Sequence, residues 1–60
     1  MNKKTFTVKP LTDKKGFSEV TLYVGDEVLF ENGEPDIYYV DDKHLNRFCE
    51  LVKEWGFTPR

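Results

Sequence analysis

The hydrophobic pattern of this chain changes its period once, directly after Val40. Before that point apolar residues alternate with polar ones in short runs, which is typical of half-buried β-strands. After it, Leu45, Phe48, Val52 and Trp55 recur at steps of three or four residues, which is typical of an amphipathic helix. Because an apolar helix stripe must be buried against something, the pattern predicts a small sheet followed by one helix that covers it.

Four alternating runs before Val40 are predicted to be strands, because they are rich in β-branched and aromatic residues and are separated by turn-forming residues. They span residues 4–9, 17–24, 27–31 and 37–40. The predicted fold class is α+β. We expect an antiparallel sheet of three to four strands (β-β-β-β-α) covered on one face by a C-terminal helix, forming a single small domain over the whole chain.

The ends of the predicted helix, which spans residues 41–55, have their own signals. Asp41 or Asp42 can accept hydrogen bonds from the free amide groups of the first turn. Gly56 is the residue type that most often follows the last turn, and Phe57 is then placed to fold back on that turn.

The register of the second and third strands decides which residues share a face of the sheet. A three-residue turn would place Val24 opposite Val28 and Leu22 opposite Phe30, so that the apolar residues of both strands share one face. A two-residue turn would instead place acidic residues opposite Val24 and Val20. We therefore predict the longer turn.

Pairing of the third and fourth strands through the loop 32–36 then places Phe30 opposite Tyr38 and Val28 opposite Val40, all under the helix. The other face carries an apolar strip with an acidic rim, made of Tyr23, Leu29, Ile37 and Tyr39 with Glu19, Glu27 and Glu31. One helix covers only one face of a sheet, so this strip is predicted to bind a partner. The alternative is a register shifted by one residue, which would make half of these residues core.

The charges of the chain are segregated along the sequence. Residues 17–42 contain eight acidic residues and no Lys or Arg. The first 16 residues, in contrast, contain five lysines and one aspartate. A contiguous negative field attracts basic partners and repels nucleic acid. The alternative is that the basic N-terminal strand lies beside the acids and neutralises them within the monomer, because exposed pairs of this kind are common and weak.

The sequence therefore predicts a non-enzymatic protein-interaction module, a small cytoplasmic regulator or inhibitor. It would bind a basic protein partner, or a second copy of itself, through the acidic, aromatic sheet face. The alternative is nucleic-acid binding through the basic N-terminal strand and loop, at Lys3, Lys4, Lys14 and Lys15. The net charge of −2 disfavours that alternative.

Catalytic, metal and cofactor sites are not predicted. His44 and Cys49 lie about 140° apart around the helix and do not form a dyad. A single cysteine excludes an intramolecular disulfide and fits a reducing cytoplasm. Calcium-loop and phosphate-loop patterns are absent, and there is one histidine. The start of the chain has no continuous apolar run, so we expect a complete small protein without signal peptide or membrane span.

Overall fold

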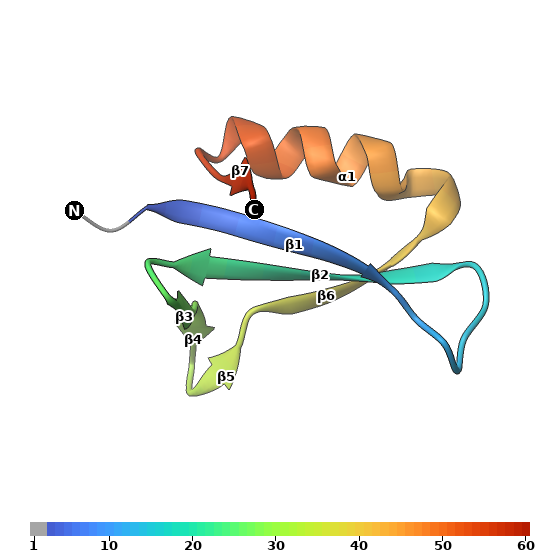
Figure 1. Ribbon diagram of the computed structural model, residues 1–60, viewed down its shortest axis with the longest axis horizontal. Coiled ribbons are helices and arrows are strands. Elements are labelled where there is room, and N and C mark those ends of the chain that lie inside the picture. The colour runs from blue at the N-terminus through green and yellow to red at the C-terminus, as the bar shows by residue number, and fades with distance from the viewer. Residues whose placement is uncertain (1–2) are drawn as a thin grey trace.

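The computed structural model describes residues 3–60, and Met1 and Asn2 lie outside the described residues. The chain forms a twisted sheet with α1 packed along one side of it (Figure 1). In order, the elements are β1 (Lys4–Pro10), β2 (Phe17–Val24), β3 (Glu27–Val28), β4 (Phe30–Glu31), β5 (Glu34–Pro35), β6 (Ile37–Asp41), α1 (Asp42–Glu54) and β7 (Thr58–Pro59).

Strand β2 is the centre of a five-stranded sheet. One of its edges pairs antiparallel with β1, from Lys4 opposite Val24 to Pro10 opposite Ser18. The short strand β7 pairs in parallel with the far edge of β1. The predicted α+β class with a C-terminal helix on a mostly antiparallel sheet is therefore confirmed, whereas the expected three to four wholly antiparallel strands are corrected to five strands with mixed pairing.

The other edge of β2 is shared by two strands, with β3 at its C-terminal end and β6 along the rest. Between them the chain leaves the sheet after Leu29 and returns at Asp36. The Leu29 N–H donates to the Leu22 carbonyl over 2.9 Å, and the Asp36 N–H donates to the Leu29 carbonyl over 2.7 Å. The Leu22 N–H in turn donates to the Asp36 carbonyl over 3.2 Å, so β2 holds both ends of the excursion.

The excursion is a second, separate two-stranded hairpin made of β4 and β5. Its turn is Asn32-Gly33, with φ angles of 54° and 79°. Positive φ at both turn positions matches the twist of a tight hairpin, which is why Asn-Gly is the favoured pair there. The hairpin projects from the β2–β6 side of the sheet (Figure 1).

The predicted three-residue turn after β2 is wrong. Gly25 and Asp26 form a two-residue turn, and Val24 lies opposite Glu27 rather than Val28. Gly25 has a φ of 66°, which a residue without Cβ adopts readily at the first position of such a turn.

The prediction failed because it assumed that all of residues 27–31 form one strand paired with β2. In that case Glu31 would lie opposite Val20, but the strand leaves β2 first and Tyr38 of β6 takes that place. The predicted pairs of Phe30 with Tyr38 and of Val28 with Val40 are therefore also wrong. Phe30 is 61% exposed rather than buried under the helix.

Helix α1 begins and ends as the sequence indicates. The side chain of Asp41 accepts a hydrogen bond from the Lys43 N–H over 3.0 Å, which identifies Asp41 as the N-cap. Trp55 is the C-cap, and Gly56 follows with a φ of 99°. The Phe57 N–H then donates to the Val52 carbonyl over 3.2 Å, so the chain folds back onto the last turn as predicted.

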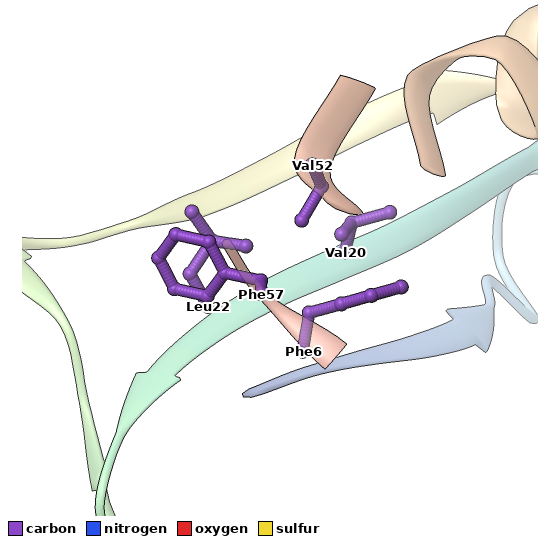
Figure 2. Close-up of a cluster of buried hydrophobic side chains, with 5 residues drawn as sticks. All are labelled: Phe6, Val20, Leu22, Val52 and Phe57. Carbon is purple, nitrogen blue, oxygen red and sulfur yellow. The ribbon is translucent and has the colours of Figure 1, made fainter. Parts of the chain in front are cut away.

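The buried core lies between α1 and the sheet. Figure 2 shows its five buried apolar side chains, which come from β1, β2, α1 and the segment between α1 and β7. They are Phe6, Val20, Leu22, Val52 and Phe57. Leu29, Tyr38, Val40, Leu45, Phe48 and Cys49 pack around them and are partly buried.

Phe57 enters the core because the chain folds back after Gly56 at the end of α1. Replacing Phe57 therefore tests whether this end of the helix is fixed to the sheet. We expect Phe57→Ala to lower the free energy of unfolding by about 3–5 kcal/mol, because a buried ring is replaced by a cavity. The measurement is urea unfolding followed by circular dichroism. Leu51→Ala is the matched control, because Leu51 lies near the end of α1, close in sequence to Phe57, but is 43% exposed. Equal losses for the two variants would contradict this core.

Candidate functional site

The face of the sheet turned away from α1, called here the open face, carries four of the predicted site residues. Because side chains alternate along a strand, residues next to the core positions of β2 and β6 point to this face. They are Glu19, Tyr23, Ile37 and Tyr39. Tyr39 is 63% exposed, whereas Ile37 is half-buried.

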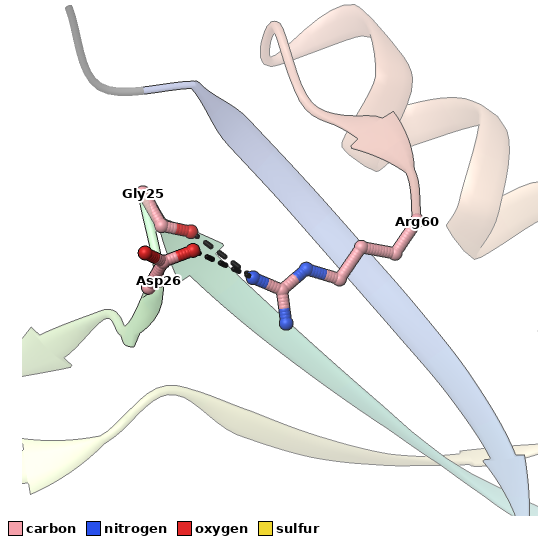
Figure 3. A network of polar contacts seen from close by, with 3 residues as sticks. All are labelled: Gly25, Asp26 and Arg60. Carbon is pink, nitrogen blue, oxygen red and sulfur yellow. Dashed lines mark hydrogen bonds and ion pairs between the residues drawn. The ribbon is translucent and has the colours of Figure 1, made fainter.

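Tyr23 on the open face is covered by the last residue of the chain. The Arg60 guanidinium carbon lies 4.1 Å from the centroid of the Tyr23 ring. The same guanidinium donates to the Gly25 carbonyl over 3.1 Å and lies 4.0 Å from the Asp26 carboxylate. Figure 3 shows the Arg60 side chain reaching across β1 to this turn. Tyr23 is therefore engaged within the monomer, and the open face is less of an exposed aromatic strip than predicted.

The other three predicted site residues do not lie on the open face. The two-residue turn places Glu27 beside Val24 and Leu29 beside Leu22, in the rows that face α1. Leu29 packs against the core. Glu31 is carried away from the sheet on the β4–β5 hairpin. The predicted ring of acids around one apolar strip is therefore wrong.

Acidic and aromatic residues do meet elsewhere, in a groove of about 430 Å³ between the β4–β5 hairpin and the C-terminal end of α1, called here the hairpin groove. Both walls lie at the same end of the molecule as the start of β1 (Figure 1). The lining residues are Lys4, Leu22, Val24, Leu29, Glu31, Asp36, Tyr38, Trp55 and Phe57. The groove is thus an apolar, aromatic cleft with two carboxylates and one ammonium group.

The aromatic wall of the hairpin groove is built by contacts between β6 and α1. The ring centroids of Tyr38 and Phe48 lie 5.3 Å apart, and those of Phe48 and Trp55 lie 6.3 Å apart in an edge-to-face arrangement. Distances and orientations of this kind are favourable for ring pairs. The chain of rings positions Trp55, which stays 47% exposed beside the groove.

Tyr38 links the aromatic and acidic parts of the groove. Interaction of its hydroxyl with the Asp36 carboxylate is the main reason that the pKa of Tyr38 is raised above its usual value. Burial and the negative charges of Asp36 and Glu31 raise the pKa further. The phenol of Tyr38 therefore stays neutral to a higher pH than that of an ordinary tyrosine.

Lys4 occupies the basic corner of the hairpin groove. Its Nζ lies 5.7 Å from the centroid of the Phe57 ring, within the range of a cation–π contact. An ammonium group therefore already sits on an aromatic wall of the groove in the protein itself.

The lysines proposed for nucleic-acid binding do not form one patch. Lys3 and Lys4 lie at the start of β1, whereas Lys14 and Lys15 lie in the loop after its end. The seven residues of β1 separate the two pairs by about 20 Å. Lys14 is in addition placed over the Phe17 ring, 5.1 Å from its centroid.

A second hollow, of about 720 Å³, opens on the open face near the loop between β1 and β2. Its lining mixes one lysine, two acids and apolar residues: Leu11, Asp13, Lys14, Phe17, Glu19 and Tyr39. The charged residues of this lining sum to −1, as those of the hairpin groove do, and Lys14 covers Phe17 as Lys4 covers Phe57. The hairpin groove differs in having the exposed Trp55 on its wall and the facing, exposed Glu31 and Glu34 on its hairpin.

Side chains that bind metal ions are not gathered into a cluster in residues 3–60. No group of three or more His, Cys, Asp or Glu side chains in that range could hold a metal ion. Cys49 is a free, partly buried thiol. The one described helix, α1, has 13 residues and is too short and too polar to cross a membrane.

Six groove residues were missed at the sequence level: Leu22, Val24, Asp36, Tyr38, Trp55 and Phe57. The last three were predicted only as core or helix-end residues. The signal that could have found the groove is Asn32-Gly33, because this pair predicts a tight hairpin that would lift Glu31 and its neighbours out of the sheet. No family model, curated protein or solved structure matches the chain.

The raised pKa of Tyr38 predicts a dependence of stability on alkaline pH. The folded state holds the phenolic proton more tightly than the unfolded chain, so this contribution is complete below the ordinary pKa of about 10 and is lost as the pH rises through the folded pKa. In urea unfolding, the wild type should lose more stability than Tyr38→Phe between about pH 8 and pH 11. Parallel pH profiles for the two proteins would contradict the raised pKa of Tyr38.

Proposed function

We propose that this protein is a non-enzymatic interaction module that binds a basic segment of a protein partner in the hairpin groove. The observation that carries the proposal is the meeting of Glu31 and Asp36 with the exposed Trp55 in one cleft. Aromatic rings supply contact area and cation–π attraction, and the carboxylates supply charge and hydrogen-bond acceptors. A Lys or Arg side chain meets both needs.

The β4–β5 hairpin supports this proposal through its own electrostatics. Glu31 and Glu34 lie directly opposite each other across the two strands, and both are exposed. Like charges in this position destabilise a hairpin. A partner's cation between or beside them would relieve that repulsion. The arrangement thus costs the free protein some stability and favours the bound state.

Charge balance in the groove points to the same class of partner. Two carboxylates and one ammonium group leave its lining with a net charge of −1, and Glu34 on the same hairpin adds to the field. Such a field speeds the encounter with a basic partner and disfavours phosphate-bearing ones. Nucleic acid is the weaker alternative, because the four lysines proposed for it lie at opposite ends of β1.

We propose that the protein is a small cytoplasmic regulator or inhibitor, a role that the same features support. A module of this size would act by covering a basic segment of its partner. The free thiol of Cys49 fits a reducing compartment. Pairing of two copies through the open face, where Tyr39 is exposed, is the competing use of the protein.

Charge reversal at Glu31 should separate binding from folding. The probe is a fluorescein-labelled peptide of alternating Leu and Arg residues, followed by fluorescence anisotropy. Glu31→Lys should weaken its binding about tenfold, because one attractive charge becomes repulsive. The same change should leave the thermal midpoint equal or higher, because position 31 then attracts Glu34 instead of repelling it.

The matched control is Glu19→Lys, which makes the same change of charge on the open face. It should leave peptide affinity within about twofold of the wild type, since the groove is on the other side of the sheet. A larger loss from Glu19→Lys than from Glu31→Lys would assign binding to the open face and contradict the proposal. Absence of peptide binding to the wild type would contradict it as well.

A further inference from the structure

One cation already lies in the hairpin groove of the free protein. Lys4 lines the groove, and its ammonium group is 5.7 Å from the centroid of the Phe57 ring. Lys4 is an exposed residue at the start of β1. A basic partner that enters the groove therefore encounters the Lys4 ammonium group at the aromatic wall.

We propose that an arginine side chain of the partner displaces Lys4 from the hairpin groove. This inference rests on the proposed function, because it names the group of the basic partner that enters the cleft. Lys4 would then compete with the partner's arginine for the aromatic wall. Its presence in the groove would weaken the affinity for the partner rather than strengthen it.

The contact that holds Lys4 is a weak one. Its distance of 5.7 Å is close to the outer limit of about 6 Å at which a cation is attracted by a ring. Within residues 3–60, no carboxylate lies within ion-pair distance of Lys4. Exposed lysine contacts of this kind contribute little because the ammonium group is strongly hydrated. Lys4 can therefore swing into water at small cost.

Arginine fits the vacated wall better than lysine does. A guanidinium group is planar, more weakly hydrated than an ammonium group, and able to stack on a ring while it donates to carboxylates. The protein itself illustrates the difference. Arg60 lies 4.1 Å from the Tyr23 ring, whereas Lys4 and Lys14 lie 5.7 Å and 5.1 Å from theirs.

The carboxylates of the groove complete the match. Arg60 combines its ring contact with the Asp26 carboxylate and the Gly25 carbonyl. The hairpin groove offers the same combination of groups, with aromatic rings beside Glu31 and Asp36. An incoming guanidinium could donate to these carboxylates from a position on the aromatic wall.

Two substitutions at position 4 should change affinity in opposite directions. In the anisotropy assay with the Leu/Arg peptide, Lys4→Met should strengthen binding about threefold, because the competing cation is gone. Lys4→Arg should weaken binding about threefold, because a guanidinium competes better for the same wall. Lys9→Met and Lys9→Arg are the controls, since Lys9 is exposed on the same strand and they make the same changes of charge and shape outside the groove.

A second peptide with Lys in place of every Arg tests the choice of cation. We expect it to bind the wild type at least about threefold more weakly than the arginine peptide. Equal affinities, weaker binding by Lys4→Met, or equal effects at positions 4 and 9 would each overturn the inference while leaving the groove as the binding site. If neither peptide binds the wild type, the proposed function fails together with the inference.

Discussion

The sharing of one edge of β2 by two strands determines the rest of this structure. β3 takes the C-terminal part of that edge and β6 takes the remainder, so the residues between them cannot stay in the sheet. Leu22 fixes both ends of the excluded segment, by accepting from the Leu29 N–H and donating to the Asp36 carbonyl. The segment satisfies its own backbone groups by forming the β4–β5 hairpin. One wall of the hairpin groove is therefore a consequence of how hydrogen bonds along β2 are divided.

The features that could be predicted from the sequence are those that depend on local chemistry. The helix has a clear period of 3.6, an aspartate cap at Asp41 and a stop at Gly56, and each was found within a residue of the predicted position. The strands at β1, β2 and β6 also match closely. These signals act over a few residues, so tertiary contacts do not change them.

The register was not predictable in the same way, because it depends on which strand pairs with the far edge of β2. On the sequence alone, the two-residue turn is disfavoured because it places Glu27 opposite Val24 and Glu31 opposite Val20. The first of these pairs is present in the structure, but the second does not form, because β6 brings Tyr38 to Val20 instead. Because of this error, Glu27, Leu29 and Glu31 were predicted on the open face, and the predicted site was misplaced with them. A one-residue change of turn length is enough for this, since side chains alternate between faces.

The acidic residues of segment 17–42 thus lie on two surfaces of the protein rather than one. Glu19 stays on the open face beside Tyr39, while Glu31 and Asp36 border the groove with Trp55. Part of the acidic block is also neutralised within the monomer, because Arg60 reaches Asp26. The acids of the hairpin remain uncompensated by any close ion pair within residues 3–60. The hairpin combines these acids with the exposed Trp55 in one groove, and for this reason we propose it, rather than the sheet face, as the contact for a basic partner.

The most direct test of this account is the set of intermolecular nuclear Overhauser effects between the arginine peptide and the protein in solution. The arginine δ-methylene protons should show contacts to the Leu29 methyl groups and the Trp55 indole ring. Leu29 reaches the groove only because of the two-residue turn, so these contacts test the register and the binding site together. Contacts to Ile37 and Tyr39 in their place would move the interaction to the open face and contradict the account.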